Sequence, residues 1–471
     1  MFRNIIEKFT KKKALSPQAI AELINTTPEA LQEFEKAYHV ARVTRDRTAD
    51  TALPDTVQPT SALTDAQEAS VDNMIENIVN DLLAQAAVWS TNDTKSTDIT
   101  PVKTAGNMID RVNPADIAAL PADYRPQLTG TSMSVDLQQP SSPAVLYFLQ
   151  QYLKRGDRRD YDMFRQGLDI LDLDPLLYSI IAQNKNSMGH WLPAINDAVK
   201  NTSDPFFKIP ATKVMTVPIT LLQLTRQPYE LLTPTTKRIL NEFCHKAFDL
   251  DDSKTYFVKT GTNASKFNFR NAKVQGASEV QTLGEYLLYN HSRALSMASP
   301  LCQPSIYGMA TTTEWAVRDF IEDKEDNPTI YNGLPLHTEY RVFVDMNANN
   351  VLSIENYWRP DVMEQRFERP ALTGLEEVDN VHDAITYGAN KQRLCERYEA
   401  NKDTVAAHIK ELLPNIDLNG QWSIDVMQNG DDFYIIDMAT AQSSAFYESV
   451  EPALRRPLPE NWIPKLPYSR W

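Results

Sequence analysis

The chain has 471 residues, 42% of them hydrophobic and 23% charged, which is typical of a globular protein long enough for two or three domains. Its formal net charge of -15 argues against a general nucleic-acid-binding or anionic-membrane-binding surface, because both need a basic field. The three cysteines form no Cys-x-x-Cys pair and no apolar run is long enough to span a membrane, so we expect a cytoplasmic protein with reduced thiols and no zinc site.

The first part of the chain is interrupted by a polar segment. Residues 1–40 are predicted to form a small helical unit, with helices opened by Ser16-Pro17 and Thr27-Pro28. From 41 to 140 the composition shifts to Thr, Ser, Asp, Ala, Pro and Gln, and only Val71–Trp89 has helical periodicity. We expect this region to be flexible with one embedded helix, or to be held on the body of the protein or on a partner. Residues 141–205 return to a helix-rich pattern.

From Phe206 onward, short strands alternate with helices, which indicates an architecture of α/β layers. Two hairpins are expected, the second with an Asn-Gly turn. Residues 448–471 form a Pro-rich tail. The expected elements are short strands over 206–224, a helix from Thr233 to about Phe248, a strand over 254–259, a helix over 279–297, a strand over 314–321, a hairpin of 340–345 and 351–357, a long helix over 390–413 and a hairpin of 422–427 and 433–438.

A lysine ends an apolar strand and enters a small, polar, Gly-containing loop in the segment YFVKTGTNASK, residues 256–266. In such an arrangement Lys259 can hold a phosphate while backbone N–H groups of the loop close over a polyphosphate. A second lysine, Lys266, ends the segment. The alternative is a solvated strand-end lysine followed by an ordinary loop. Neither a Walker pattern nor GxGxxG occurs in the chain, so the familiar nucleotide loops are excluded.

Two arginines lie within apolar strands. Arg318 belongs to EWAVRDFIE, residues 314–322, a strand that could offer backbone groups to an adenine and the carboxylate of Glu322 to ribose hydroxyls. Arg341 belongs to EYRVFV, residues 339–344, where strand alternation places it with Phe343 on the face opposite three apolar side chains. Each strand could instead be a surface strand with solvated charges, and Arg341 taken alone is expected to face solvent.

Two aspartates, Asp425 and Asp437, lie within the apolar strands of the final hairpin. Burying a carboxylate is costly unless it meets a cation or hydrogen-bond donors. A shared Mg²⁺ would offset this cost, because magnesium takes one or two carboxylates together with substrate phosphates. The alternative is a pair of edge-strand aspartates facing water. Counted from the Asn-Gly turn the two are not directly opposite, so a loop irregularity or a diagonal offset must bring them onto one face.

The order of these features resembles the ATP-grasp superfamily. EYRVFVD followed by NNVLSIENY is similar to a strand pair of the cell-division-cycle-123 family, and FVKTGTNASK is similar to its lysine loop. Arg318, Arg341 and Lys259 also fit a related phage and bacterial ATP-grasp clade named for two arginines and one lysine. The resemblance spans Tyr256 to Phe446. It implies an α+β fold in which an ATP-grasp domain over 206–447, with two α/β subdomains around an ATP cleft, follows a helical N-terminal region.

The resemblance implies ATP and Mg²⁺ as cofactors. Carried over to this sequence, it implies that Lys259 and Lys266 contact the ATP phosphates. Glu322 would lie near the ribose, with Asp319 as a competitor for that role.

The same resemblance assigns the remaining charged residues. Arg318 and Arg341 would be catalytic, facing the phosphates and the reacting acyl group, and Asp425 and Asp437 would hold Mg²⁺. The family's metal strand has an asparagine two residues after its last acid, a position that is Ala439 here. Either a neighbouring polar side chain compensates or one metal is lost.

The resemblance implies one of three functions. The first is a carboxylate–amine ligase that uses ATP and Mg²⁺ to form an acyl phosphate, which an amine or thiol then captures. Its carboxylate and amine substrates are unknown, and one could be a protein. The second is an ATP-binding assembly chaperone or adaptor without ligase turnover, which Ala439 favours unless Thr440 or Gln442 supplies the missing ligand. The third is phosphotransfer on the same fold.

Overall fold

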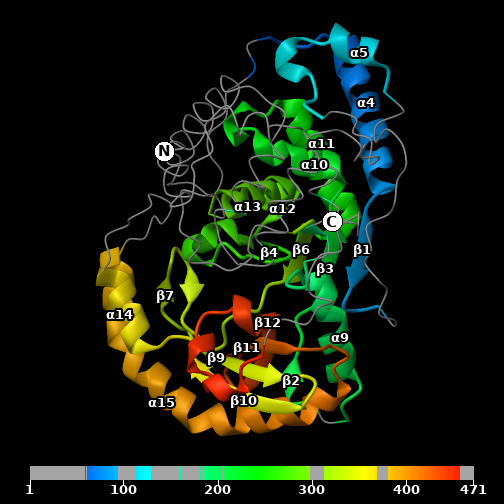
Figure 1. The fold of residues 1–471 in the computed structure, drawn as a ribbon. Coiled ribbons are helices and arrows are strands. Elements are labelled where there is room, and N and C mark those ends of the chain that lie inside the picture. The colour runs from blue at the N-terminus through cyan, green and yellow to red at the C-terminus, as the bar shows by residue number, and fades with distance from the viewer. Residues whose placement is uncertain are drawn as a thin grey trace, which may run out of the picture.

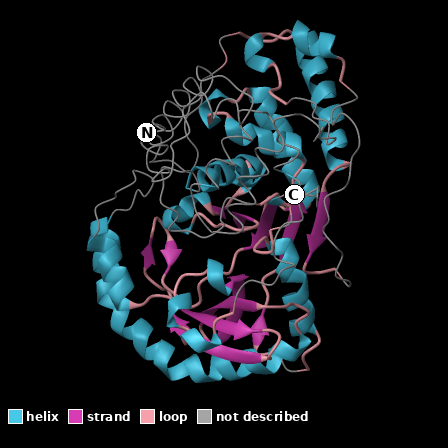
Figure 2. Ribbon diagram, viewed as in Figure 1, coloured by secondary structure: helices cyan, strands magenta, loops and turns pink. Residues whose placement is uncertain are grey.

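The computed structural model describes Pro59, 61–93, 112–128, Asp160, Tyr178, 181–182, 184–203, 205–297, 312–368 and 380–456. The helical unit predicted for 1–40, the residues of 141–205 outside those ranges and the tail beyond 456 therefore lie outside the described residues. The described part is a mixed α+β fold, which confirms the predicted fold class at that level (Figures 1 and 2).

Two five-stranded sheets form the centre of the molecule. The first has the order β1-β3-β6-β4-β5, with all neighbours antiparallel. Its strands are β1 (Ala87–Ser90), β3 (Thr212–Thr216), β6 (Glu314–Asp319), β4 (Tyr256–Thr260) and β5 (Lys273–Val274). The second has the order β10-β9-β11-β12-β2, in which only the β12–β2 pair is parallel. Its strands are β10 (Asn350–Asn356), β9 (Thr338–Asp345), β11 (Gln421–Asn429), β12 (Asp432–Thr440) and β2 (Phe207–Lys208). A small ribbon pairs β7 (Thr329–Ile330) with β8 (Leu334–Pro335).

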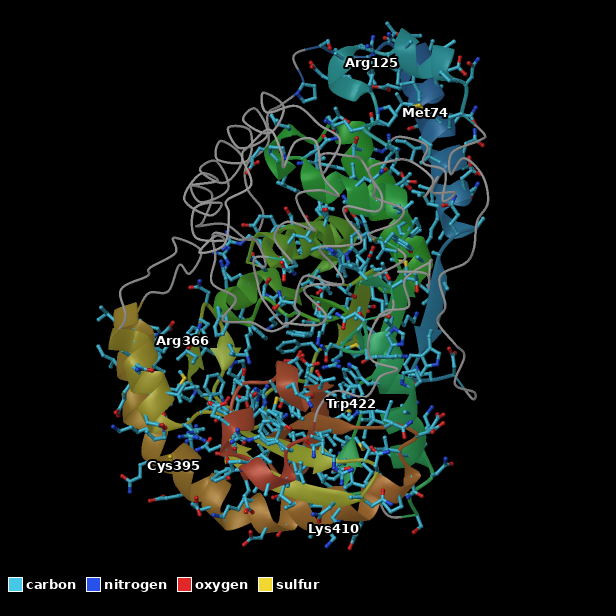
Figure 3. The ribbon with its side chains drawn as sticks, viewed as in Figure 1. Met74, Arg125, Arg366, Cys395, Lys410 and Trp422 are labelled. Carbon is cyan, nitrogen blue, oxygen red and sulfur yellow. The ribbon has the colours of Figure 1, made fainter. Side chains whose placement is uncertain are left out.

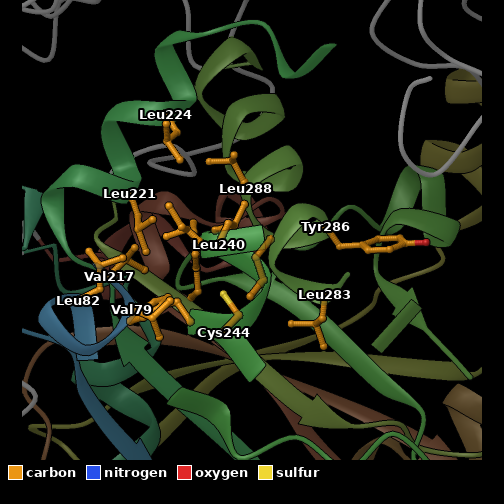
Figure 4. Packing of buried hydrophobic residues seen from close by; sticks show 14 of the residues in the cluster. Val79, Leu82, Val217, Leu221, Leu224, Leu240, Cys244, Leu283, Tyr286 and Leu288 are labelled. Atoms are coloured by element: carbon orange, nitrogen blue, oxygen red, sulfur yellow. The ribbon is translucent and has the colours of Figure 1, made fainter. Parts of the chain in front are cut away.

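Helices cover one face of the first sheet and form the larger core with it. Leu221, Leu240, Cys244 and Leu288 converge there, with Val79 reaching in from the N-terminal part of the chain (Figure 4). The helices concerned are α4 (Asp65–Leu83), α10 (Ile219–Gln223), α11 (Pro234–Phe248), α12 (Ala277–Gln281) and α13 (Leu283–Met297). The short α5 (Pro114–Ala119) lies near the N-terminal end of α4 in Figure 1.

The second core lies behind the second sheet. The β9 side chains of Tyr340, Val342 and Val344 are fully buried there, as their alternation with Arg341 predicts. They pack with α9 (Met188–Lys200) and with α15 (Asn380–Leu412), which runs along this sheet in Figure 1. The shorter α14 (Pro360–Glu368) precedes α15. Because the back of the second sheet is filled by apolar side chains, its charged residues point to the other face.

Several predicted elements are confirmed. Helix α11 begins directly after Thr233, whose hydroxyl accepts a hydrogen bond from the Thr236 backbone N–H, with proline in the first turn. Both predicted hairpins form, as β9–β10 and β11–β12. The long helix is also present, but α15 begins at Asn380 rather than Asn390.

Two predicted elements are wrong. The helix predicted for Val71–Trp89 ends at Leu83, and Ala87–Ser90 is strand β1, paired with β3. The edge of β3 offers backbone hydrogen-bond partners to residues 87–90, which local periodicity in the sequence cannot reveal. Trp89 is buried in this strand. The strand expected after Pro218 is instead helix α10, which begins at the residue following that proline.

The described part of the polar segment is held on the body of the protein. Helix α4 packs its apolar face into the larger core, where Ile75 and Leu82 are almost completely buried. Within the described residues, α4 and β1 are both attached to the first sheet and its helices. Among the described residues, no helix combines the length and apolarity needed to cross a membrane.

Candidate functional site

The two sheets face each other through charged side chains. Lys259 on β4 extends its ammonium to the carboxylate of Asp437 on β12, at 3.0 Å between Nζ and Oδ1. Beside it, Arg318 on β6 donates from Nη1 to the backbone carbonyl of Ile436 at 2.9 Å. Side chains crowd the space between the sheets in Figure 3, where Trp422 marks the second sheet. The two sheets are therefore joined by cations of the first and oxygen atoms of the second.

Lys259 is among the most deeply buried charged residues of the described chain, with only 2% of its surface exposed. It lies on the same face of the first sheet as Ala316, its partner on the neighbouring strand β6. Burial lowers the pKa of this lysine, and the nearby Asp437 carboxylate opposes that shift. The alternative of a solvated strand-end lysine is therefore wrong.

Arg318 is also buried and points into the same space. Its Nε donates to the hydroxyl of Thr212 at 3.1 Å, while its buried Nη2 has no hydrogen-bond partner among the described residues. Burial lowers the pKa of the guanidinium to about 10, so it remains charged at neutral pH. A buried charged donor without an acceptor is costly, and an anionic ligand oxygen would remove that cost.

The aspartates of the final hairpin are brought together by a bulge. Asn429 lies opposite Asp432 and Val426 opposite Ile435, but the next pair is Asp425 with Asp437. Ile436 is the extra residue, and it shifts the register so that both carboxylates lie on one face. This is the irregularity that the sequence required for the two aspartates to converge.

Arg341 on β9 pairs with Asp425 on β11, which pairs in turn with Asp437 on β12. The three residues therefore form a row across three neighbouring strands. The guanidinium holds Asp425 in a bidentate pair, with Nε to Oδ1 at 2.8 Å and Nη2 to Oδ2 at 2.6 Å. Both side chains are largely buried, at 13% and 10% exposure. The expectation that Arg341 faces solvent is therefore wrong, because its charge is held in the space between the sheets.

Lys266 reaches the same region from η4, a 3-10 helix over Lys266–Asn271. Its ammonium lies 3.9 Å from the centroid of the Tyr357 ring, and the Arg341 guanidinium lies 4.9 Å from the same centroid. Glu339, two residues before Arg341 on β9, is the acid that acts most strongly on this lysine. The sequence analysis placed Glu339 at the start of the strand that contains Arg341 but gave it no role in the site.

Glu314 is a second buried acid that the sequence did not single out as a site residue. It lies on the same face of β6 as Arg318, four positions earlier, and accepts a hydrogen bond from the Gly189 backbone N–H at 2.8 Å. Burial raises the pKa of its carboxyl to about 7, and Lys259 opposes the shift. Strand alternation relative to Arg318 is the signal that could have identified this acid.

Glu314 also explains the glycine of the lysine loop. A Cβ atom at Gly261 would lie 2.5 Å from the Thr312 hydroxyl and 2.8 Å from the Glu314 carboxylate. Only glycine lets the loop that follows Lys259 approach β6 this closely.

The end of β12 is held by a residue from the N-terminal half of the chain. The side-chain oxygen of Asn186 accepts from the Thr440 backbone N–H at 2.8 Å and from its hydroxyl at 3.0 Å. Ala439, the position where the resembling family has asparagine, provides no ligand atom. Thr440 is committed to Asn186 and Ser443 in this structure. No sequence signal linked Asn186 to this hairpin.

The predicted ribose-binding acids do not join this cluster. Glu322 is exposed beyond the end of β6, and its backbone carbonyl accepts from the Asn429 side chain at 2.9 Å. Its competitor Asp319 lies on the opposite face of β6 from Arg318 and pairs with Lys254 at 3.3 Å. The described structure thus brings together Lys259, Lys266, Arg318, Arg341, Asp425 and Asp437, and leaves Glu322 apart.

Weak similarities to solved structures include two forms of one protein. A C-terminally truncated Cdc123 from Schizosaccharomyces pombe matches with a TM-score of 0.33 and 12% identity, covering 59% of this chain and 96% of that one. Cdc123 from the same organism matches with a TM-score of 0.32 and 13% identity, covering 58% and 93% respectively. These TM-scores are below the level that establishes a shared fold. No protein-family model matches the sequence, and no match is found among curated proteins.

The residues themselves fit a polyphosphate accompanied by a divalent cation. Lys259 and Arg318 provide buried positive charge, one of them with a donor left free for an anion. No group of three or more His, Cys, Asp or Glu side chains in the described ranges is arranged to hold a metal by itself. Asp425 and Asp437 alone would leave a cation dependent on ligand oxygens from outside the chain, which is how Mg²⁺ is commonly bound with nucleotides.

Proposed function

We propose that the space between the two sheets binds ATP with Mg²⁺ and activates a carboxylate for transfer to an amine. The two sheets would then be the two subdomains of an ATP-grasp fold. The observation that carries this proposal is the convergence of Lys259 and Arg318 from the first sheet on the bulged Asp425–Asp437 pair of the second.

In this proposal Lys259 and Arg318 hold phosphate oxygens. Their charges would replace the present contacts to Asp437 and the Ile436 carbonyl with contacts to the ligand. Lys259 needs little reorganisation because its burial already fixes the side chain, and preorganised charge is the main source of electrostatic catalysis in phosphoryl transfer. Lys266 would contact the phosphates from the opposite side of the loop.

Asp425 and Asp437 are the residues that would hold Mg²⁺. When bound, the cation would neutralise charge on the phosphates. Arg341 would orient Asp425 through its bidentate pair and stabilise charge on the reacting acyl group. Glu322 remains our proposed ribose contact, from the exposed segment that follows β6.

A second candidate function is an ATP-binding assembly factor without ligase turnover. Ala439 favours it, because this position offers no third oxygen or nitrogen ligand beside the aspartate pair. Thr440, the nearest polar replacement, already binds Asn186 and Ser443. Both candidates share the nucleotide site and differ in whether bound ATP is consumed.

The decisive experiment combines binding with turnover. Thermal unfolding is followed with and without ATP and Mg²⁺, and ADP release is then measured with panels of carboxylates and amines. We expect a rise in melting temperature and ADP release that needs both substrates. A melting shift without ADP release across the panels would favour the assembly factor, and the absence of any shift would reject both candidates.

A further inference from the structure

The ammonium of Lys266 lies against an aromatic ring and within the field of a buried acid. It lies over the Tyr357 ring, 3.9 Å from the centroid. The Tyr357 backbone N–H donates to the carbonyl of Glu339 at 3.0 Å, so the ring and the acid are carried by adjacent parts of the β9–β10 hairpin. This pair of residues, Glu339 and Tyr357, is referred to below as the ammonium site.

Glu339 is an unusual residue to find in this position. Only 7% of its surface is exposed, and it has no direct ion pair among the described residues. The neighbouring Arg341 donates from Nε and Nη2 to Asp425 and from Nη1 to the Ala445 carbonyl. A buried carboxylate without its own cation is costly, and the nearby charge of Lys266 reduces that cost.

We propose that the ammonium site of Glu339 and Tyr357 binds the acceptor substrate through a primary ammonium group, and that Lys266 holds this place until a nucleotide draws it away. The inference rests on the proposed function, in which Lys266 moves to the phosphates of ATP. It goes further by naming the residues that would recognise the amine.

The chemistry of the site favours an ammonium over other acceptors. An aromatic face and a carboxylate both attract a compact cation, and neither offers a neutral thiol a comparable interaction. A lysine side chain of the protein itself already fits there, which shows that an alkyl ammonium is accommodated. An amino group on a flexible alkyl chain, such as the side chain of a lysine, is the substrate class that matches this occupant.

The site also lies where the amine is needed. Arg341, proposed to face the reacting acyl group, contacts the same Tyr357 ring at 4.9 Å. The amine nitrogen would attack the acyl carbon, forming the C–N bond and breaking the bond from that carbon to the phosphate oxygen. Of the two ammonium protons lost, one passes to Glu339 and the other to the departing phosphate. Burial raises the pKa of the Glu339 carboxyl, which suits it to accept that proton.

The test uses Lys266→Ala, which removes the ammonium and most of the side chain and so leaves its place over the Tyr357 ring open. The probe is n-butylamine, whose binding to the nucleotide-free full chain is measured by titration calorimetry. We expect the variant to bind the probe about tenfold more tightly than the wild type, as cation–π and carboxylate contacts become available. Titration is done at pH 8.5, where an alkyl ammonium with a pKa of about 10.4 is still charged. The high pH keeps Glu339 ionised in the variant. Without Lys266, the pKa of Glu339 loses one of the charges that lower it, while Asp425 still raises this pKa and Arg341 still lowers it.

The matched controls are Lys266→Ala/Glu339→Gln and Lys266→Ala/Glu364→Gln. Glu364 is an exposed acid paired with Lys391 on the surface. The first control should lose the gain in affinity and the second should keep it. n-Butanol, which lacks the charge, should gain much less affinity than n-butylamine in the Lys266→Ala variant.

Failure of this inference is separable from failure of the nucleotide proposal. Equal n-butylamine affinity in wild type and Lys266→Ala, with folding confirmed by thermal unfolding, would overturn the ammonium site without involving ATP. A gain that survives Glu339→Gln would overturn it as well. A wild-type melting shift with ATP and Mg²⁺, measured in parallel, tests the nucleotide site by itself.

Discussion

Asp425 lies directly opposite Asp437 across β11 and β12, although their distances from the turn differ. The bulge at Ile436 makes this possible, and the backbone carbonyl of that same residue accepts a hydrogen bond from the Arg318 guanidinium. One irregularity therefore aligns the two carboxylates and provides the contact that brings the first sheet against the second. The two aspartates nevertheless differ in environment, because Asp425 is held by Arg341 and Asp437 is 39% exposed.

The first prediction follows from that difference. Asp425→Asn should lower the free energy of unfolding by roughly 3 kcal/mol, because it leaves the buried Arg341 charge without its partner. Asp437→Asn should cost less, since the side chain is partly solvated, although it also leaves Lys259 buried and unpaired. Chemical denaturation without ligands measures both changes.

The same two variants test the proposed metal site. Both should weaken binding of ATP in the presence of Mg²⁺ much more than binding of ATP with the metal chelated, as measured by calorimetry. Asp345→Asn is a control, because this buried aspartate of β9 pairs with Arg456 at the far end of the strand. Normal magnesium dependence in either Asp425→Asn or Asp437→Asn would reject the paired-ligand proposal.

The second prediction concerns the two lysines. Lys259→Met should abolish the rise in melting temperature produced by ATP and Mg²⁺, because it removes a buried charge that faces the phosphates in our proposal. Lys266→Ala should give a smaller loss, since its ammonium lies over the Tyr357 ring and would have to move to reach the phosphates. Lys402→Ala, a surface change on α15, should leave the shift unchanged. An intact shift in Lys259→Met would remove the basis of the nucleotide assignment.

Local signals in the sequence were sufficient for the elements that local chemistry determines. Thr233-Pro234 marked the start of α11, and an Asn-Gly pair marked the turn of the β11–β12 hairpin. They were insufficient where a partner lies far away in the chain. Nothing near Trp89 indicates that residues 87–90 pair with β3, more than 100 residues later, so helical periodicity extended the predicted helix too far.

The same distinction applies to the candidate site. Lys259 was selected as a strand-end lysine that enters a small polar loop, and Arg318 and Asp437 as charged residues within apolar strands. The structure gives each of them contacts. The bulge at Ile436 was required by the register count but could not be located from sequence. Asn186 could not be identified at all, because its contact with Thr440 depends on the packing of α9 against the second sheet.

The third prediction compares two glycines of opposite sensitivity. Gly261→Ala should destabilise the protein by about 1–3 kcal/mol, because the new methyl group would overlap Thr312 and Glu314 and push β6 away. Gly388→Ala should stabilise it by roughly 0.5–1 kcal/mol, since this residue is exposed within α15 and nothing lies near its added Cβ. Denaturant midpoints measure both, and a Gly261→Ala variant as stable as the wild type would contradict the packing described around Lys259.

The last prediction uses the buried acid Glu314. Burial raises its pKa from 4.5 to about 7 in the folded protein, so the folded state binds this proton more tightly than the unfolded state does. Its contribution should therefore favour folding below about pH 4.5, and should be lost as the pH rises to about 7. Glu314→Gln keeps an oxygen acceptor for the Gly189 N–H and removes the titration.

The quantity to measure is the free energy of unfolding of Glu314→Gln minus that of the wild type, at intervals between pH 4.5 and pH 8. We expect this difference to rise with pH by roughly 3 kcal/mol and to level off above about pH 7, because each tenfold change in proton affinity is worth about 1.4 kcal/mol. Glu364→Gln, on the surface of α14, should give a difference that stays nearly constant. Taking a difference between two proteins cancels the titration of the other acids, including Glu339. A flat difference for Glu314→Gln would mean that Glu314 remains ionised in the folded protein through a stronger pairing with Lys259, and a difference that falls with pH would mean that this pairing outweighs burial.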